Sequence, residues 1–246
     1  MNRKTAIITG ASTGIGKAIA KLFLDNSFNI VINSSNLENL SKTFKELESP
    51  DSVKMVVGDV SLKSTGEQLV ACAIDNFGAI DILINTAGIF SPKPFLDVEE
   101  SELDLFFQVN LKGTFLTSQS VISKMSNKGG AIINIGTVLV DHAIAGFPAS
   151  AAVVSKGGIH TLTKQLAAEF GAQNIRVNTI SPGIIRSPLQ EKMGVDNVDD
   201  FSDLHLLKKI GEPSDIAEMA LFLAESNFIT GETFNIDGGH VAGHQF

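Results

Sequence analysis

The segment "TAIITGASTGIG", Thr5–Gly16, decides the fold. A continuous apolar run leads directly into a loop with glycines at positions 10, 14 and 16, and a helical pattern, Gly16–Asn26, follows. Such a turn lets the backbone approach a pyrophosphate closely, while the helix N-terminus supplies N–H groups and positive dipole. Glycine-rich turns also arise for steric reasons alone, but the place of this loop at the first strand–helix junction favours nucleotide binding. The expected nucleotide-binding residues of this loop are Gly10, Ser12, Thr13, Gly14, Ile15 and Gly16.

Short apolar runs alternate with longer amphipathic ones along the whole chain. The expected strands are 5–10, 28–33, 53–58, 81–85, 131–136, 175–180 and 233–237. The expected helices are 16–26, 37–48, 64–77, 99–125, 149–171 and 214–226. Continuous β-branched runs suit strands that are covered on both faces. The pattern predicts an α/β fold: one Rossmann-type domain over 1–246, with a doubly wound parallel sheet of about seven strands and helices on both faces. Residues 186–211 lack a strand and are expected to form a helical flap over the substrate.

The charge, the cysteine content and the hydropathy of the chain exclude several classes of protein. The 246 residues carry a net charge of −8 without a basic stretch, so nucleic acid is not an expected partner. The single cysteine, Cys72, cannot form an internal disulfide, which fits a reducing compartment. No apolar stretch reaches the roughly 20 residues of a membrane span, and the strand pattern from Thr5 leaves no room for a targeting segment. We expect a cytoplasmic protein with no membrane partner.

Further motifs follow the glycine loop in a fixed order. They are "GDV" (58–60), "NTAG" (85–88), "VNLKG" (109–113), "SPGIIRSP" (181–188) and "ITGETFNIDGG" (229–239). With this order and spacing, the chain resembles the short-chain dehydrogenase/reductase (SDR) family, and in particular its 3-oxoacyl-carrier-protein reductase branch. The resemblance implies a nicotinamide dinucleotide and a homotetramer. It also implies cofactor contacts from Asp59, Val60, Asn85, Ala87, Gly88, Pro182, Gly183, Ile184 and Ser187.

The end of the second expected strand bears on the choice of cofactor. An acid there would bind the ribose 2′-hydroxyl of NAD, and an arginine would accept the 2′-phosphate of NADP. This chain has "NSSN" (33–36), in which Ser34 and Ser35 offer hydrogen bonds without charge. NADP and NAD both stay open, and the missing acid slightly favours NADP.

The resemblance also implies a Tyr-x-x-x-Lys helix, a serine and an asparagine as the catalytic set. Lys156 in "VVSKGG" matches the lysine, which in the family binds the nicotinamide ribose and lowers the tyrosine pKa. The residue four positions earlier is Ala152, and the chain contains no tyrosine at all. Thr137 in "NIGT" takes the place of the serine, and Asn110 that of the asparagine.

Another group must therefore handle the proton if the chain is an enzyme. The candidates are His142, whose ordinary pKa suits transfer near neutral pH, a water held by Asn110 and Lys156, or the substrate itself. The first hypothesis is an NAD(P)-dependent oxidoreductase of a small carbonyl or alcohol. The alternative is a nucleotide-binding pseudoenzyme that serves as a regulatory or structural subunit. His240 and His244 lie four residues apart but lack further ligands at matching spacing, so no metal site is expected.

Overall fold

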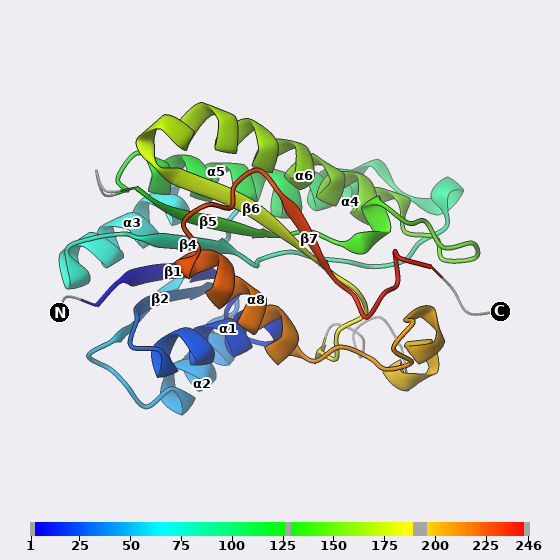
Figure 1. The fold of residues 1–246 in the computed structure, drawn as a ribbon, viewed down its shortest axis with the longest axis horizontal. Helices are drawn as coiled ribbons and strands as arrows, with labels where there is room; N and C mark the ends of the chain where they lie inside the picture. Colours follow the sequence, from blue (N-terminus) through cyan, green and yellow to red (C-terminus); the bar gives the residue numbers. More distant parts are fainter. Residues whose placement is uncertain (1–2, 126–128, 189–195, 244–246) are drawn as a thin grey trace.

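The computed structural model describes residues 3–125, 129–188 and 196–243, and its centre is one parallel sheet (Figure 1). The strand order is β3-β2-β1-β4-β5-β6-β7, and every neighbouring pair is parallel. All seven expected strands are confirmed, with ends that differ by one or two residues. They are β1 Thr5–Thr9, β2 Asn29–Ser34, β3 Val53–Val57, β4 Ile82–Asn85, β5 Gly130–Ile135, β6 Ile175–Pro182 and β7 Thr233–Ile236.

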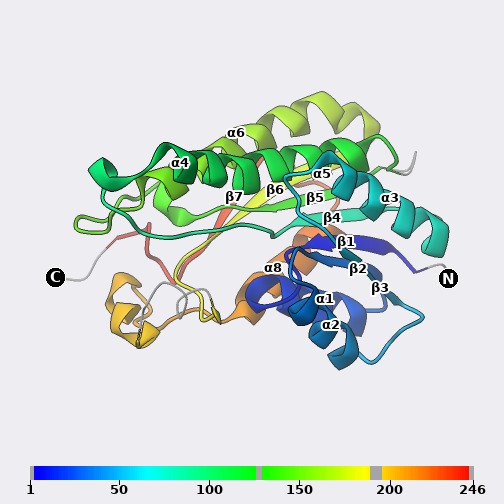
Figure 2. The ribbon, with the colours of Figure 1, turned by 180° about the vertical axis from the view of Figure 1, so that it is seen from behind.

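Helices cover both faces of the sheet. The main ones are α1 Gly14–Asp25, α2 Leu37–Glu46, α3 Lys63–Phe77, α4 Glu100–Phe106, α5 Gly113–Ile122, α6 Ser150–Phe170 and α8 Pro213–Glu225. Figures 1 and 2 show α1, α2 and α8 on one face and α3 to α6 on the other. Alternate residues of β1 divide between two cores: Ala6 and Ile8 pack with α1 and α8, whereas Ile7 packs with α3 and α5. Burial on both faces is what the continuous β-branched runs indicate.

The long helix expected over 99–125 is interrupted. α4 passes into a π-helix, η2 (Phe107–Lys112), before α5 begins at Gly113. Asn110 lies within this π-helix. Its side chain forms hydrogen bonds with residues outside the helix, as described below. π-segments of this kind occur frequently at functional sites.

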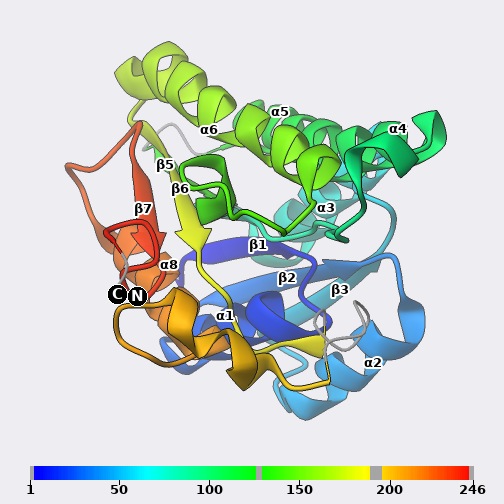
Figure 3. The same ribbon diagram turned by 90° about the vertical axis from the view of Figure 1, so that its right-hand side faces the viewer.

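The structure describes part of the expected flap, 186–211. It contains one 3₁₀-helix, η5 (Val198–Leu204), and a bridge between Ile185 and Gly211, while residues 189–195 lie outside the described part of the chain. Elsewhere in the described residues, 3₁₀ turns occur at η1 Phe95–Asp97, η3 Val138–Val140 and η4 Gly171–Gln173. In the view of Figure 3, the segment after β6 crosses the sheet edge where the parallel strands end.

No helix within residues 3–125, 129–188 and 196–243 combines the length and the apolar character that crossing a membrane requires.

Candidate active site

A cleft of about 790 Å³ runs along the carboxyl edge of the sheet. The strand order reverses between β1 and β4, and ligands of open α/β sheets bind at such a point. All the cofactor-binding residues expected from the sequence line the cleft, apart from Asn85. They are Gly10, Ser12, Thr13, Gly14, Ile15, Gly16, Ser34, Ser35, Asp59, Val60, Ala87, Gly88, Lys156, Pro182, Gly183, Ile184 and Ser187.

The glycine loop fits a pyrophosphate. Gly10 and Gly14 have φ angles of +63° and +51°, which side chains other than hydrogen disfavour. A Cβ atom on Gly16 would lie 2.3 Å from the Gly10 carbonyl oxygen, so the turn closes only with glycine there. α1 then begins with no acidic residue in its first turn, and its N-cap, Thr13, makes no side-chain capping bond. The helix dipole and free N–H groups therefore suit a negatively charged ligand.

The end of the cleft at β2 and β3 is polar and carries no positive side chain among the described lining residues. Ser12 Oγ donates to Ser34 Oγ at 3.0 Å, and the Asn36 N–H donates to the same oxygen at 3.1 Å. Asp59 is fixed at the edge because its carboxylate accepts the Ser61 N–H at 2.9 Å. These groups can hold an adenosine through hydrogen bonds.

Asn85 lies beneath the cleft instead of lining it. Its amide donates to Ser118 Oγ at 3.0 Å and to Asn134 Oδ1 at 2.9 Å, and its oxygen accepts from Thr117 Oγ1 at 2.7 Å. Asn134 continues the network to Thr163 Oγ1 at 2.8 Å. This buried chain of bonds joins β4 and β5 to α5 and α6, so Asn85 fixes the strand end that carries Ala87 and Gly88.

The opposite end of the cleft holds two of the expected catalytic residues, Thr137 and Lys156. Thr137 follows β5, and its hydroxyl accepts the Leu139 N–H at 3.3 Å. The Lys156 amine reaches across from α6 and donates to the Ile135 carbonyl at 2.7 Å. Burial lowers the pKa of Lys156 to about 8. An amine so placed, and otherwise able to donate two further hydrogen bonds, suits the hydroxyl groups of a sugar.

Asn110 supports this end without lining the cleft. Its Oδ1 accepts the Ile89 N–H at 2.8 Å, and its Nδ2 donates to the Ile89 carbonyl at 3.0 Å and to Ser155 Oγ at 2.9 Å. A Cβ atom on Gly88 would lie 3.0 Å from both Asn110 Oδ1 and Lys156 Nζ. Asn110 thus positions the β4 loop against the helix that carries Lys156.

Ala152 and His142 also lie outside the set of lining residues. Ala152 is fully buried and packs with Phe106 and Ala151, so its methyl group belongs to a small apolar cluster. His142 is half-buried, and its N–H donates to the Val138 carbonyl at 3.0 Å.

Some lining residues were not foreseen from the sequence. Phe90 and Phe147 stack with ring centroids 6.1 Å apart, and Leu139, Ile144, Phe201 and Leu204 add further apolar surface. His240, which follows β7, lines the cleft as well. All of these residues belong to loops or short turns, where no periodicity indicates which side chains meet. Only the "DGG" that precedes His240 marks a sharp turn.

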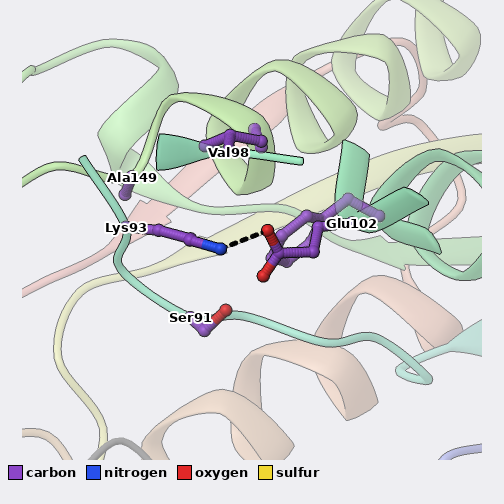
Figure 4. A pocket seen from close by; sticks show the side chains of 7 residues that line it. Ser91, Lys93, Val98, Glu102 and Ala149 are labelled. Atoms are coloured by element: carbon purple, nitrogen blue, oxygen red, sulfur yellow. Dashed lines mark hydrogen bonds and ion pairs between the residues drawn. The ribbon is translucent and has the colours of Figure 1, made fainter. Parts of the chain in front are cut away.

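A second, much smaller pocket lies near the start of α6 (Figure 4). Its volume is about 10 Å³, which is enough for about one water molecule. Lys93 Nζ bonds to the Glu102 carboxylate beside it and lowers the pKa of Glu102. The Lys93 N–H also donates to the Pro148 carbonyl at 2.7 Å. These contacts tie the β4–α4 loop to the segment before α6, and the pocket has no room for a substrate.

Comparisons with known proteins agree on one family. A family profile described as "Enoyl-(Acyl carrier protein) reductase" matches residues 10–241. A 3-oxoacyl-[acyl-carrier-protein] reductase of Thermotoga maritima is 35% identical over 97% of this chain and 98% of its own. The BbsD subunit of a hydroxy(phenyl)methylsuccinyl-CoA dehydrogenase of Thauera aromatica is also 35% identical, over 97% of each chain. A crystal structure of a short-chain dehydrogenase/reductase from Brucella melitensis superposes with a TM-score of 0.90 at 30% identity, covering 96% of each chain.

Proposed function

Because this chain belongs to the short-chain dehydrogenase/reductase family, we propose that it is an NAD(P)-dependent oxidoreductase of a small carbonyl or alcohol substrate. The observation that carries the proposal is the cleft, which joins a glycine loop at the N-terminus of α1 to a buried amine, Lys156, at the other end. Its volume of about 790 Å³ has room for a dinucleotide and a small substrate. When bound, the nicotinamide supplies or accepts the hydride.

The residues of the chain bind the cofactor and orient the substrate. The Gly10–Gly16 loop binds the pyrophosphate, and Asp59 and Ser34 hold the adenosine end. Lys156 donates from its amine to the nicotinamide ribose. Thr137 offers a hydroxyl to the substrate oxygen, in the place of the family's serine. The Phe90–Phe147 pair excludes water from the reacting end and favours a substrate with an apolar group.

The adenosine end favours NADP slightly over NAD. No acid occurs among residues 33–36 to repel a 2′-phosphate, and the hydroxyls of Ser34 and Ser35 can bind one. We expect the substitution Ser35→Asp to weaken NADPH binding several-fold and to leave NADH binding unchanged or improved. Isothermal titration calorimetry with both nucleotides measures the difference.

A second candidate function is favoured by one specific observation. The family's tyrosine position is Ala152, and Ala152 is sealed in an apolar cluster with Phe106 and Ala151. In this alternative the chain is a pseudoenzyme, a regulatory or structural subunit that binds NAD(P) and performs no chemistry. General acid–base catalysis contributes about 10²- to 10⁴-fold, so loss of the phenol slows hydride transfer without forbidding it. The retained Lys156 and Thr137 support the oxidoreductase as the first candidate.

One experiment separates the two candidates. NADPH and NADH binding is measured by calorimetry, and turnover is followed at 340 nm with a panel of apolar ketones and aldehydes. The oxidoreductase proposal predicts micromolar binding and slow turnover, and at least tenfold weaker binding in Lys156→Met. Lys164→Met, on the exposed face of the same helix, is the control and keeps wild-type binding. Binding without turnover, with activity appearing only in Ala152→Tyr, would establish the pseudoenzyme. Failure to bind either nucleotide would reject both.

The resemblance also supports a homotetramer, and the apolar residues exposed on two faces of the fold agree with this proposal.

A further inference from the structure

Three segments contribute large apolar side chains to the wall of the cleft. They are Phe90 in the loop after β4, Leu139, Ile144 and Phe147 in the segment from η3 to α6, and Phe201 and Leu204 in η5. Each of these side chains lines the cleft and is partly exposed. Apolar surface that stays open in a concave site is the kind that a ligand covers. We call these six residues the apolar wall, and they bear on which substrate fits.

The first two segments of the wall are fixed to each other in the free protein. The ring centroids of Phe90 and Phe147 lie 6.1 Å apart, and the ring planes are within 14° of parallel. The Lys93 N–H donates to the Pro148 carbonyl at 2.7 Å, and the Lys93 amine bonds to the Glu102 carboxylate (Figure 4). An aromatic surface that is already fixed loses little conformational freedom when it binds a ligand.

Contacts between histidine rings place η5 at the same end of the cleft. His205 follows η5, and its Nε2 accepts the Ile184 N–H at 3.2 Å, just beyond the end of β6. The His240 ring centroid lies 5.8 Å from that of His205 and 5.1 Å from that of His142. Because His142 belongs to the same loop as Phe147, the three segments of the apolar wall surround one end of the cleft.

The contact between these histidine rings is one of packing. The rings meet edge to face, at 80° and 78°. Within residues 3–125, 129–188 and 196–243, no three potential ligands are arranged to hold a metal ion. His244, which follows His240 by four residues in the sequence, lies outside the described residues.

The charged side chains near the apolar wall are mainly acidic. Lys156 is the only lysine or arginine among the described lining residues, whereas η5 contributes two acids, Asp200 and Asp203. The Asp203 carboxylate lies 3.2 Å from the Lys208 amine, which partly offsets its charge. The Asp200 carboxylate accepts a hydrogen bond from the neutral amide of Asn197 at 2.8 Å. Asp200 thus adds a negative charge beside the apolar wall.

The cation of the cleft is engaged elsewhere. The Lys156 amine donates to the Ile135 carbonyl at 2.7 Å, and its remaining N–H groups are assigned above to the nicotinamide ribose. A carboxylate or phosphate on a substrate would therefore meet Asp200 with no further cation among the described lining residues to bind it. Like charges brought close together disfavour binding, and salt screens this repulsion between exposed groups.

We propose that the substrate is an uncharged carbonyl compound that carries an aromatic ring, or the matching alcohol, and that Asp200 disfavours substrates with a carboxylate or phosphate. The proposal rests on the oxidoreductase function above. The substrate ring lies against Phe90 and Phe147, which favours a flat aromatic group over a saturated ring of similar size.

The reaction on such a substrate is balanced by the nicotinamide and the solution. During reduction, the carbonyl carbon receives the hydride of NAD(P)H with its two electrons, and the C=O π pair moves to oxygen. That oxygen takes one proton, which comes from the solution. The products are the aromatic alcohol and the oxidised nicotinamide, and alcohol oxidation runs in reverse.

A panel of ketones tests the wild type without any substitution. Acetophenone and cyclohexyl methyl ketone differ in aromaticity at similar size, and 4-acetylbenzamide and 4-acetylbenzoate differ in charge. With NADPH near neutral pH, we expect kcat/KM to be about fivefold higher for acetophenone than for the cyclohexyl ketone. It should be about tenfold higher for the amide than for the carboxylate. Acetoacetyl-CoA, an anionic thioester, should be as poor a substrate as the carboxylate.

The role of Asp200 is tested by Asp200→Asn, which removes the charge and keeps the size. We expect the kcat/KM ratio of 4-acetylbenzoate to 4-acetylbenzamide to rise about fivefold. Sodium chloride at about 0.5 M should raise the same ratio in the wild type but not in this variant, because salt screens an exposed charge. Asp104→Asn is the control and keeps the wild-type ratio, since Asp104 is exposed on α4 and is not among the described lining residues.

The aromatic surface is tested by Phe147→Leu, which keeps an apolar side chain but removes the ring. Its kcat/KM for acetophenone should fall about fivefold, through KM more than through kcat, and the preference over the cyclohexyl ketone should largely disappear. Phe95→Leu is the control, because Phe95 is 75% exposed and is not among the described lining residues. Should Phe147→Leu fail to fold, Phe90→Leu provides the same test.

The possible failures are distinguishable. Turnover of 4-acetylbenzoate or acetoacetyl-CoA that equals that of the neutral aromatic ketones, or turnover confined to compounds without a ring, would overturn the substrate class and leave the oxidoreductase intact. An unchanged carboxylate-to-amide ratio in Asp200→Asn would overturn the role of Asp200. A wild type that binds NADPH but turns over no carbonyl compound would overturn the oxidoreductase function and this proposal together.

Discussion

Burying the charged amine of Lys156 lowers the free energy of unfolding, and this effect depends on pH. Burial lowers the pKa of this amine from 10.5 to about 8. Below pH 8 the amine is protonated in the folded and the unfolded chain, so folding carries the full cost of desolvating the charge. Between pH 8 and 10.5 the folded chain releases the proton first, and the cost diminishes as the pH rises. This residue therefore makes the free energy of unfolding increase with pH in that window.

We expect Lys156→Met to raise the free energy of unfolding at pH 7 by on the order of 1 kcal/mol, because the relieved desolvation exceeds the lost hydrogen bond to Ile135. The advantage should shrink by pH 9.5. Urea unfolding at both pH values measures it, with exposed Lys164→Met as a control that changes little. A gain that is the same at both pH values would show that the folded protein keeps this amine protonated up to pH 9.5, so that burial does not lower its pKa.

The sequence predicts the positions of some site residues better than those of others. Lys156 and the glycines of Gly10–Gly16 are identified because fixed spacing ties each to a motif on one element. The side chain of Asn85 is different, since its direction depends on Thr117 and Asn134, which arrive from α5 and β5. Its motif predicts a residue at the cleft, and the structure places the side chain beneath it.

Among the elements, α6 packs so closely against the π-helix η2 that Gly158 of α6 has no room for a side chain. A Cβ atom on Gly158 would lie 2.8 Å from Leu111 Cδ2, whereas one on Gly157 meets only Val140 Cγ1 at 3.9 Å. Gly157→Ala should stabilise the protein by about 0.5–1 kcal/mol, because alanine restricts the unfolded chain and suits a helix. Gly158→Ala should destabilise it by about 1–3 kcal/mol through overpacking. Chemical denaturation measures the free energy of unfolding of both variants, and each variant serves as the control for the other. Equal changes in the two variants would contradict the close contact between Gly158 and Leu111.

The regular elements are predictable from the sequence because their patterns are local. The β-branched runs and amphipathic stretches each mark a strand or a helix within a few residues. The π-helix is not predictable in this way: Asn110 bonds to Ile89 and Ser155, which lie 21 and 45 residues away. A periodic pattern over 99–125 therefore predicts one continuous helix. It does not show where contacts with residues distant in sequence convert α-helix into π-helix.

On the scale of the whole molecule, the parallel sheet brings the carboxyl ends of all seven strands to one edge, which is why motifs scattered from Gly10 to Ser187 converge on one cleft. The order of the motifs predicts this convergence. The contact of the His240 ring with those of His142 and His205 is different, because these residues follow β7, η3 and η5 and no motif links them. The meeting of three loops depends on the complete fold.

Apolar side chains are exposed on opposite sides of the sheet. Phe115 on α5 and Val154 on α6 are 48% and 58% exposed, and on the other side Phe222 on α8 and Phe228 after it are 56% and 101% exposed. Figure 1 shows α5 and α6 on one side of the sheet and α8 on the other. Exposed apolar patches of this kind mark protein interfaces, and two different two-fold interfaces on one subunit close into a tetramer.

We therefore expect the wild type to be a tetramer by light scattering coupled to gel filtration. A charge placed in either patch should break one interface: Val154→Glu and Phe222→Glu should each give dimers, and the double variant should give monomers. Lys42→Glu, on the exposed surface of α2 away from both patches, should remain tetrameric. A monomeric wild type at micromolar concentration would reject the tetramer. If Phe222→Glu left the assembly intact, only the α8 face would be excluded as an interface, and Val154→Glu would still test the α5–α6 face.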